Sequence, residues 1–568
     1  MPSGYDERGG RLARIALVTA MAISAAVILI GGRDLWFWSD ELDWLVGFAD
    51  FAPRSLLTPH ASHLLAIPRV IYEVLPRIFG VDYLPFRVLG VICLQANAVL
   101  VFHLVRRRMG PVVALMPALV LLFYGSAQDV VVSPLGIPFT LSIALGLGAL
   151  AAVERRTLRG DVAAMFLLSL SILSHTFGTI VALGVAAYYL LERGRRRELW
   201  VAVVPIVLWF AWWLWARQFD QEIASSSNVL GAPLFVVEAA GSALEGMFGI
   251  PPELGGHVHP LAVLLRVGFA LLAVAGGALL AVRLASGRGT PWTWAYLVSI
   301  LAFWGGIALA EGPDRSVTTP RYMLFGAIMI VLLAAEVFRD RELSPRALRR
   351  TAGVAALCLA GNLAFLIYIF PGFADDARDV KAQLGSVEIG GAAVDPAFRV
   401  RALGPPASEF IPSPAFALDE FAADVGPLGD SVEALRGQPE DVRRGADFVL
   451  VRALRIAAVE LPAGGGTRAT ECVDHPPAAD GYTTFELPPG ADSVELVRDS
   501  GAVGAELDLG RFADVPDTAV GVLRPGRAAA ILIPDDGIDQ PWTARTTGTV
   551  RVCAISGDTG ATRADRGK

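Results

Sequence analysis

Long apolar segments fill the first two-thirds of this chain, and they constrain its fold more than any other feature. A helix needs roughly 20 apolar residues to cross a bilayer, and about eleven segments approach that length. The predicted spans lie near residues 13–31, 84–105, 111–124, 136–153, 161–174, 177–192, 199–216, 260–283, 292–311, 320–337 and 351–371. Segments 111–124 and 161–174 are short, which indicates tilted or broken helices. The pattern predicts an α-helical polytopic membrane protein.

Arginine clusters follow these segments in a regular alternation. Cytoplasmic connections of membrane proteins are enriched in Lys and Arg, and here the Arg-rich stretches fall on every second connection. The clusters are Arg8/Arg11/Arg14, Arg106/Arg107/Arg108, Arg155/Arg156/Arg159, Arg193/Arg195/Arg196/Arg197, Arg283/Arg288 and those in residues 339–350. We therefore expect a multi-pass protein of the plasma membrane with a cytoplasmic N-terminus. The alternate connections and the C-terminal third then lie outside the cytoplasm.

Composition agrees with this placement. The chain is 54% hydrophobic, with a mean hydropathy of +0.52, which excludes a soluble enzyme of this length. The net charge of −7 comes mostly from the last third, and it argues against a nucleic-acid partner. The apolar run at 15–30 follows three arginines and lacks a convincing cleavage site, so we expect an uncleaved signal anchor.

The composition changes after the last predicted span, which divides the chain into three parts. We predict a transmembrane domain at 1–371, a mixed helical subdomain at 372–470 and a β-rich domain at 471–568, together an extracytoplasmic α+β or β-sandwich-like region. The expected helices are 374–384, 431–435 and 439–454, and the expected strands are 483–487, 493–498, 505–509, 528–533 and 548–555. Cys472 and Cys553 could form a disulfide there or remain two free thiols.

An acidic stretch follows the first span, where Asp40, Glu41 and Asp43 stand among Trp36, Phe37, Trp38 and Trp44. Aromatic residues favour the membrane–water boundary, and unpaired charges at that depth are expensive. A carboxylate at the mouth of a membrane cavity could deprotonate a hydroxyl. Adjacent carboxylates could instead hold a divalent metal. A helical segment would put Asp40 and Asp43 on one face. The alternative is a solvated acidic loop.

The same outer loop contains His60 and His63. A spacing of three would place both on one helical face, suited to a phosphate or, on weaker grounds, a metal. Residues 64–79 then carry apolar positions at spacings of three and four, with Arg69, Glu73 and Arg77 along one side. We expect this stretch to be an amphipathic helix on the outer membrane surface.

A late outer turn, residues 311–322, contains Arg315 and Arg321. Both depart from the positive-inside trend, and an outward Arg at a helix mouth suits a phosphate. Tyr322 could anchor at the interface. The alternative is an ion pair with Glu311 or Asp314.

Two further polar residues, Asp129 and His175, lie at the outer ends of predicted helical hairpins. Polar groups in an apolar context are functional candidates in membranes, although both could be simple turn residues. The sequence has no Gly-rich phosphate loop, no nucleophile elbow and no Cys-based metal motif, so ATP-driven transport is not expected.

These elements resemble the GT-C superfamily of integral-membrane glycosyltransferases that use lipid phosphosugars, especially actinobacterial types. The resemblance rests on Ser39-Asp40-Glu41-Leu42-Asp43, on Pro320-Arg321-Tyr322 and on the layout of spans plus an outer domain. It covers roughly residues 10–370.

The resemblance implies that Asp40 is the general base, with Glu41 as its substitute, and that Arg321 and Arg315 hold the phosphate of a polyprenyl-phosphate sugar. The expected substrate-binding set is Asp43, His60, His63, Asp129, His175, Arg315, Arg321 and Tyr322. The expected partners are this lipid donor, a glycan or lipid acceptor and the bilayer, with no certain cofactor. The second outer loop offers Asp129 alone, where some members carry more acids. The rival interpretations are a transporter or flippase of lipid-linked glycans and a non-enzymatic glycan-binding surface protein.

Overall fold

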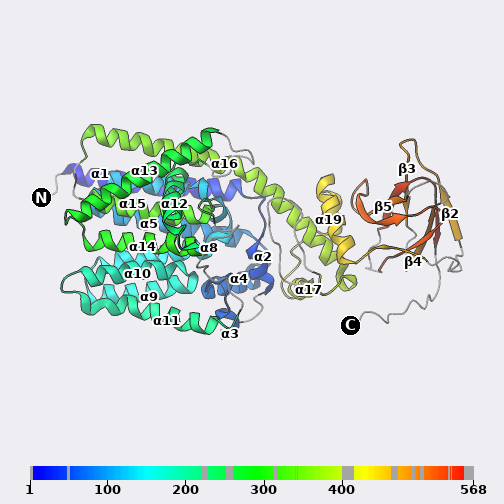
Figure 1. The fold of residues 1–568 in the computed structure, drawn as a ribbon, viewed down its shortest axis with the longest axis horizontal. Helices are drawn as coiled ribbons and strands as arrows, with labels where there is room; N and C mark the ends of the chain where they lie inside the picture. The colour runs from blue at the N-terminus through cyan, green and yellow to red at the C-terminus, as the bar shows by residue number, and fades with distance from the viewer. Residues whose placement is uncertain are drawn as a thin grey trace. The chain divides into compact units, whose positions relative to one another are not determined.

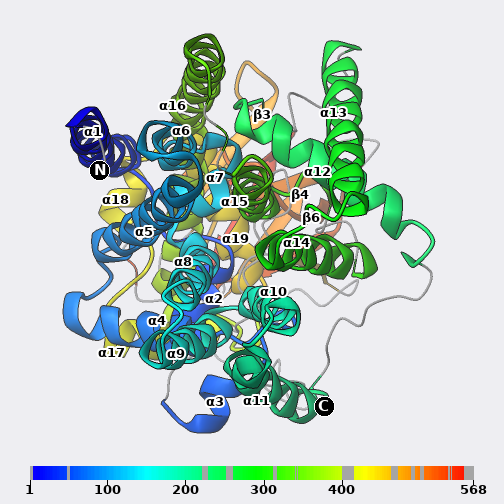
Figure 2. The ribbon, with the colours of Figure 1, turned by 90° about the vertical axis from the view of Figure 1, so that its left-hand side faces the viewer.

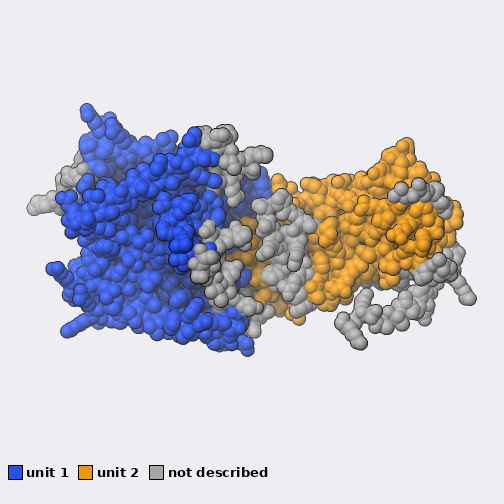
Figure 3. Space-filling view, viewed as in Figure 1, with its two compact units in different colours: residues 1–35, 50–373 blue, residues 36–49, 374–568 orange. Residues whose placement is uncertain are grey.

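The computed structural model describes residues 4–47, 51–219, 228–250, 260–310, 316–339, 341, 343–398, 415–461, 471–487, 493–498, 504–534, 538 and 540–554. The chain divides into two compact units (Figure 3). Unit 1 comprises residues 1–35 and 50–373, and unit 2 comprises residues 36–49 and 374–568. The boundary at 373 lies close to the predicted end of the transmembrane domain. The acidic stretch after the first span, however, belongs to unit 2.

Unit 1 is helical (Figure 1). Its α-helices are α1 (Gly4–Gly31), α3 (Pro53–Leu57), α4 (Ala66–Phe79), α5 (Leu84–Met109), α6 (Pro111–Leu122), α7 (Gln128–Val131), α8 (Ile137–Val153), α9 (Leu158–Ser174), α10 (Phe177–Leu191), α11 (Trp200–Ala216), α12 (Ala232–Met247), α13 (Pro260–Ala285), α14 (Pro291–Leu309) and α15 (Pro320–Val337). Short 3-10 turns are η1 (Gly125–Ala127), η2 (Pro134–Gly136) and η3 (Arg196–Leu199). Helix α16 (Pro345–Gly390) begins in unit 1 and continues into unit 2.

All of the predicted spans are helical. Within the described part of the chain, eight helices are long and apolar enough to cross a membrane, or nine if a bent pair counts as one span. The predicted number of about eleven was therefore too high: the helices at 161–174 and 177–192 fall short of a full span, and the one at 111–124 reaches it only together with the bent segment that follows. In Figure 2 several of these helices are seen close to end-on, with α8, α9 and α10 side by side. Unit 1 is thus a polytopic helical membrane domain, as predicted.

Local sequence signals set several of the helix starts. Thr290 and Thr293 form a capping box, and Pro291 occupies the first turn of α14. The hydroxyl of Thr157 accepts the backbone N–H of Gly160 at the start of α9. Pro320 opens α15, where its missing N–H costs nothing. The following residue, Arg321, is therefore fixed in the first turn of that helix.

The predicted short span at 111–124 is broken. Helix α6 ends at Leu122, and the chain continues through η1 and α7 at an angle of 44°. Gly125 lies at the break, where an added Cβ would meet the backbone of α16 at Leu366. Close approach of two backbones needs glycine. The break carries the polar segment that includes Asp129 into the helical bundle.

Helix α4 confirms the helical prediction for the outer loop, but its polar side is mostly buried, and only Arg77 of its three charged residues is exposed. Arg69 and Glu73 are buried, whereas Val70, Ile78 and Phe79 are exposed. In water this distribution would be unfavourable. Lipid reverses the preference, because apolar side chains then face an apolar solvent. The arrangement therefore fits a helix whose outer face contacts the membrane.

Unit 2 combines helices with two antiparallel sheets. Its helical elements are α2 (Asp40–Gly47), the end of α16, η5 (Gly391–Ala393), α17 (Ala415–Asp424), α18 (Val432–Arg436) and α19 (Glu440–Ala453). The strands are β1 (Ala458–Glu460), β2 (Glu471–His475), β3 (Tyr482–Glu486), β4 (Ser493–Arg498), β5 (Ala505–Gly510), β6 (Thr518–Leu523), β7 (Ala528–Leu532), β8 (Thr543–Thr547) and β9 (Val550–Ala554). The sheet orders are β1-β7-β4-β9-β2 and β3-β8-β5-β6.

The five predicted strands are present, and β1, β2, β6 and β8 were not predicted. Strand β8 is mostly polar, β6 contains Gly521 and β1 has only three residues, so their sequence signal is weak. Cys472 pairs with Cys553 across β2 and β9, and the two form a disulfide. The predicted fold class, a helical membrane protein with a β-rich appended region, is confirmed.

Candidate functional site

The first turn of α15 forms the centre of the candidate site in unit 1. A guanidinium nitrogen of Arg321 lies 3.7 Å from Oδ2 of Asp129. The Arg321 side chain is 30% exposed and that of Asp129 is 11% exposed, so the pair is accessible from the arginine side. Arg321 also lies over the ring of Tyr322. Sequence reasoning selected all three residues separately, and the fold brings them together.

Two histidines lie near this pair. His175 is buried, and its ring centroid is 4.3 Å from that of His63. Nδ1 of His63 is 3.1 Å from the hydroxyl of Thr176. Burial lowers the pKa of His175 well below its usual value, and the positive charges of His63 and Arg321 lower it further. His175 is therefore neutral at physiological pH.

The backbone around His175 fixes which of its nitrogens carries the proton. The N–H of Phe177 donates to Nδ1 of His175 at 3.2 Å. A neutral imidazole with an accepting Nδ1 carries its hydrogen on Nε2. That Nε2 is buried and has no hydrogen-bond partner. His175 thus presents an unused donor.

Aromatic rings surround the histidine and extend to Tyr322. The ring of His175 packs between Phe139 and Phe177, with centroids 4.5 and 4.4 Å away. Phe177 contacts Phe303, and Phe303 lies 6.0 Å from Tyr322. Low polarity of this kind strengthens any electrostatic contact with Arg321.

Asn362 of α16 holds the polar turn in place. Its Oδ1 accepts the backbone N–H of Ser126 at 3.2 Å. Its Nδ2 donates to the carbonyls of Gly246, Met247 and Cys358. Sequence reasoning missed this residue, although an Asn in the middle of an apolar segment is a recognisable signal.

The prediction that His60 and His63 share one face of a helix is wrong. Each residue's backbone N–H donates to the other's carbonyl, at 3.0 and 2.8 Å, so the pair closes a tight turn. The two central residues, Ala61 and Ser62, have φ angles of 43° and 65°. Two consecutive positive φ values define a hairpin turn and exclude a helix. His63 nevertheless reaches the site through His175.

The acidic stretch forms a short helix, α2, in unit 2. Asp40 is exposed in its first turn and Asp43 is half-buried, whereas Glu41 is buried. The backbone N–H of Trp38 donates to Glu41 at 3.4 Å. Asp40 therefore keeps the accessibility that a base needs, and Glu41 occupies a buried position at the helix start.

The tryptophan that opens this stretch packs within unit 2. The indole N–H of Trp36 donates to the carbonyl of Leu428 at 2.9 Å, and Lys381 lies 4.5 Å from its ring. These contacts explain why residues 36–49 belong to unit 2. A hydrogen-bond partner for the indole is typical when tryptophan is partly buried.

Hydroxyl groups precede α15. The hydroxyl of Ser316 lies 2.8 Å from that of Thr318 and 3.4 Å from that of Thr319. Arg315 lies outside the described residues. A small apolar pocket adjoins this turn, between α12, α14 and α15, and is lined by Phe235, Ala239, Trp304, Ile307, Val317, Tyr322 and Met323.

A second charged cluster lies at the other end of the helices that carry the site. Arg108, at the end of α5, bonds Glu336 at the end of α15 and Glu154 at 2.8 Å. Thr290 donates to Glu336 at 2.7 Å. The segments predicted to be cytoplasmic therefore meet at one end of unit 1, and their buried charges are paired.

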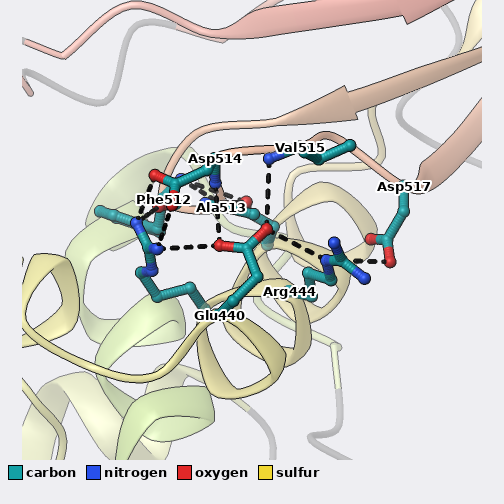
Figure 4. A network of polar contacts seen from close by, with 9 residues as sticks. Glu440, Arg444, Phe512, Ala513, Asp514, Val515 and Asp517 are labelled. Carbon is teal, nitrogen blue, oxygen red and sulfur yellow. Dashed lines mark hydrogen bonds and ion pairs between the residues drawn. The ribbon is translucent and has the colours of Figure 1, made fainter.

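Unit 2 has a polar network of its own, between α19 and the loop after β5 (Figure 4). Glu440 accepts the backbone N–H groups of Asp514 and Val515. Buried Asp447 accepts those of Phe512 and Ala513. Burial raises the pKa of Asp447 to about 6, against the opposing effect of these hydrogen bonds. The network ties the helix to the sheet and has no signal in the sequence.

Among the described residues, no three His, Cys, Asp or Glu side chains gather as a metal site. The two histidines and Asp129 belong to one region without forming a ligand set.

No family model and no curated protein matches this chain. Among solved structures, it is similar to ArnT from Cupriavidus metallidurans, whose crystal structure contains undecaprenyl phosphate. The similarity covers 74% of this chain and 90% of that chain, with 13% sequence identity and a TM-score of 0.44. At these values it assigns neither residue roles nor a substrate to this protein.

Proposed function

We propose that this protein is a membrane glycosyltransferase. It moves a sugar from a polyprenyl-phosphate donor to a hydroxyl of a glycan, lipid or protein acceptor, with inversion at the anomeric carbon. The observation that carries the proposal is the first turn of α15, where Arg321 is partly exposed beside Asp129 and the aromatic rings of the bundle.

The chemistry of this turn suits a phosphate. A helix N-terminus carries a partial positive charge, which favours an anion. Arg321 adds a guanidinium, which binds phosphate oxygens in pairs. The hydroxyls of Ser316, Thr318 and Thr319 add further donors close by. Asp129 holds the guanidinium without enclosing it.

The surroundings of the turn suit a lipid tail. The helices of unit 1 expose many large apolar side chains, which is typical of a surface in contact with lipid. A polyprenyl phosphate needs this combination of a polar turn and an apolar surface, because its chain stays in the bilayer while its head reaches a polar group.

The proposed reaction is a single displacement. The base that the resemblance implies, Asp40, accepts the proton of the acceptor hydroxyl, and the oxygen attacks the anomeric carbon. The bond between that carbon and the phosphate oxygen breaks, and the polyprenyl phosphate leaves with the bonding electrons. Arg321 stabilises the charge on the departing phosphate. One displacement from the opposite side inverts the anomeric centre.

We place the reaction outside the cytoplasm. The disulfide between Cys472 and Cys553 supports an oxidising compartment for unit 2. The Arg-rich ends of the helices meet at the end of unit 1 away from Arg321, as expected for a cytoplasmic face.

The test is sugar transfer by the full-length protein in nanodiscs, with radiolabelled polyprenyl-phosphate pentoses and hexoses and an extract of cell-envelope glycans as acceptor. We expect Asp40→Asn and Arg321→Gln to abolish most transfer. The matched controls are Asp375→Asn, an exposed acid of α16, and Arg349→Gln, an exposed arginine of the same helix. Full transfer by Asp40→Asn would reject the assigned base.

A transporter of lipid-linked glycans is the second candidate. The bend of 44° between α6 and the segment with Asp129 favours it, because broken helices that carry polar residues are typical of transporters. Movement of a fluorescent lipid-linked sugar across proteoliposomes, with no product formed, would support transport instead of transfer.

A further inference from the structure

Several buried polar atoms near Arg321 have no hydrogen-bond partner in the structure. They are Oγ of Ser126, Oε1 of Gln128, Oδ1 of Asp129 and Nε2 of His175. A buried polar group without a partner costs about 1–3 kcal/mol. Most buried polar atoms in proteins are satisfied. Unsatisfied atoms also occur elsewhere among the described residues, including Nη1 of Arg195 and Oε2 of Glu198 at the opposite end of unit 1. The four near Arg321 differ in adjoining a partly exposed arginine, so a ligand bound there could complete their bonds.

The four groups are held close to one region by the backbone. Gly136, just before α8, packs against Val130 of α7 so closely that an added Cβ would clash. Phe139, in the first turn of α8, contacts the ring of His175. The turn with Asp129 and the imidazole of His175 thus lie at the same end of α8. Besides burial, the positive charge of Arg321 lowers the pKa of His175, and its guanidinium pairs with Asp129.

The mixture of donors and acceptors points to a neutral ligand. Nε2–H of His175 is a donor, whereas Oδ1 of Asp129 and Oε1 of Gln128 are acceptors. The hydroxyl of Ser126 can do either. Acceptor oxygens repel a phosphate, so a second anion does not fit these atoms. A sugar hydroxyl both donates and accepts, and neighbouring hydroxyls match a set of this kind.

We propose that Ser126, Gln128, Asp129 and His175 form a recognition subsite for the hydroxyl groups of the donor sugar, beside the phosphate position at Arg321. The inference rests on the proposed function and makes it more specific. The site discriminates sugars by their hydroxyl pattern, because an analogue that lacks a hydroxyl leaves a buried protein group unpaired.

Asn362 acts in this scheme as a positioning residue. Its bonds to Ser126 on one side and to Gly246 and Met247 on the other hold the turn against α12 and α16. It contacts the turn through the backbone, so Oε1 of Gln128 and Oδ1 of Asp129 remain for a ligand.

The experiment compares two probes on the full-length protein in nanodiscs by isothermal titration calorimetry. One probe is polyprenyl phosphate without a sugar, and the other is a panel of polyprenyl-phosphate-linked pentoses and hexoses. We expect His175→Phe and Gln128→Leu to weaken binding of the preferred sugar-linked lipid about 10- to 100-fold. Binding of the bare lipid phosphate should change less than about threefold.

Two further variants sharpen this comparison. Arg321→Gln should weaken both probes, because both carry the phosphate. His175→Gln restores a side-chain N–H donor and should recover part of the discrimination. The matched control is His103→Gln, in the second half of α5 beside Arg106, which should bind both probes as the wild type does.

The outcomes separate the two proposals. If His175→Phe and Gln128→Leu affect both probes equally, or neither, the subsite is rejected, while sensitivity to Arg321→Gln upholds the lipid-phosphate donor. If the wild type binds none of the lipids, the donor assignment and the subsite are rejected together. Should His175→Phe fail to fold, the half-buried Gln128 decides the question.

Discussion

The two ends of the helical unit bury charged groups in different ways. At one end, Arg108 is buried between Glu154 and Glu336, and Thr290 completes the bonds of Glu336. At the other end, Arg321 is partly exposed and meets Asp129 at 3.7 Å, while Oδ1 of Asp129 has no partner. The first arrangement is complete in itself. The second leaves bonds for a ligand, which is why we place function there and structure at the opposite end.

The largest effect should come from breaking the complete network. Arg108→Met leaves, within the described part of the chain, only the exposed Arg107 and Arg339 as counter-ions for the buried carboxylates of Glu154 and Glu336. Removing one partner of a buried ion pair costs about 3–5 kcal/mol. We expect little folded protein, measured by size-exclusion chromatography and by the melting temperature in detergent. A melting temperature equal to that of the wild type would contradict a structural role for this end.

The second largest effect should be a loss of sugar transfer in a variant that still folds. Arg321→Gln should lower sugar transfer about 10²- to 10³-fold, the range for loss of one group that stabilises a developing charge. The melting temperature should stay near that of the wild type, because the side chain is partly exposed. Transfer is followed with the labelled donors described above. A variant that unfolds as Arg108→Met does would remove the distinction between the two ends.

Buried Asp447 of unit 2 provides a third case, a carboxylate whose bonds are satisfied by backbone N–H groups. Its pKa is raised from 3.8 to about 6, so the folded state holds the proton more tightly than the unfolded chain. The tighter proton binding stabilises the folded state. This stabilisation is fully present below about pH 4 and is lost as the pH rises to about 6. The slope should reach about 1.4 kcal/mol per pH unit at most.

The measurement is hydrogen exchange of the peptide that contains Phe512 and Ala513, corrected for the intrinsic rate, between pH 4 and pH 7. Protection should fall with rising pH in the wild type. In Asp447→Asn the dependence should disappear, because the side chain no longer titrates. An unchanged slope in that variant would assign the effect to another group.

The smallest expected effect concerns Arg107, a second arginine beside Arg108. Arg107 bonds the same Glu154 as Arg108, at 2.9 Å, but its side chain is 42% exposed. Exposed ion pairs contribute about 0.2–1 kcal/mol. Arg107→Gln should therefore lower stability by no more than that, seen as a small shift of the melting temperature. A loss as large as that of Arg108→Met would show that burial is not what separates these two arginines.

The sequence by itself determined the membrane class and most of the helices. Apolar length and the alternation of arginine clusters are local properties, and each predicted span is a helix in the structure. The same applies to strands with clear alternation of apolar and polar residues, such as β5. Asp129, His175 and Arg321 were also selected from the sequence, because a polar residue among apolar neighbours can be recognised without knowledge of the fold.

Only the tertiary structure decided which of these residues meet. Asp129, His175 and Arg321 come from three different hairpins. Packing of α7 against α15 and of α8 against α10 brings them into one region. Tertiary contacts also assigned Trp36 and Asp40 to unit 2, and they buried Glu41. Ala61 and Ser62 form a turn where a helix had been predicted to carry the two histidines. The periodicity of apolar residues specifies the local structure of a segment. Which other segments pack against it depends on contacts between residues far apart in the sequence.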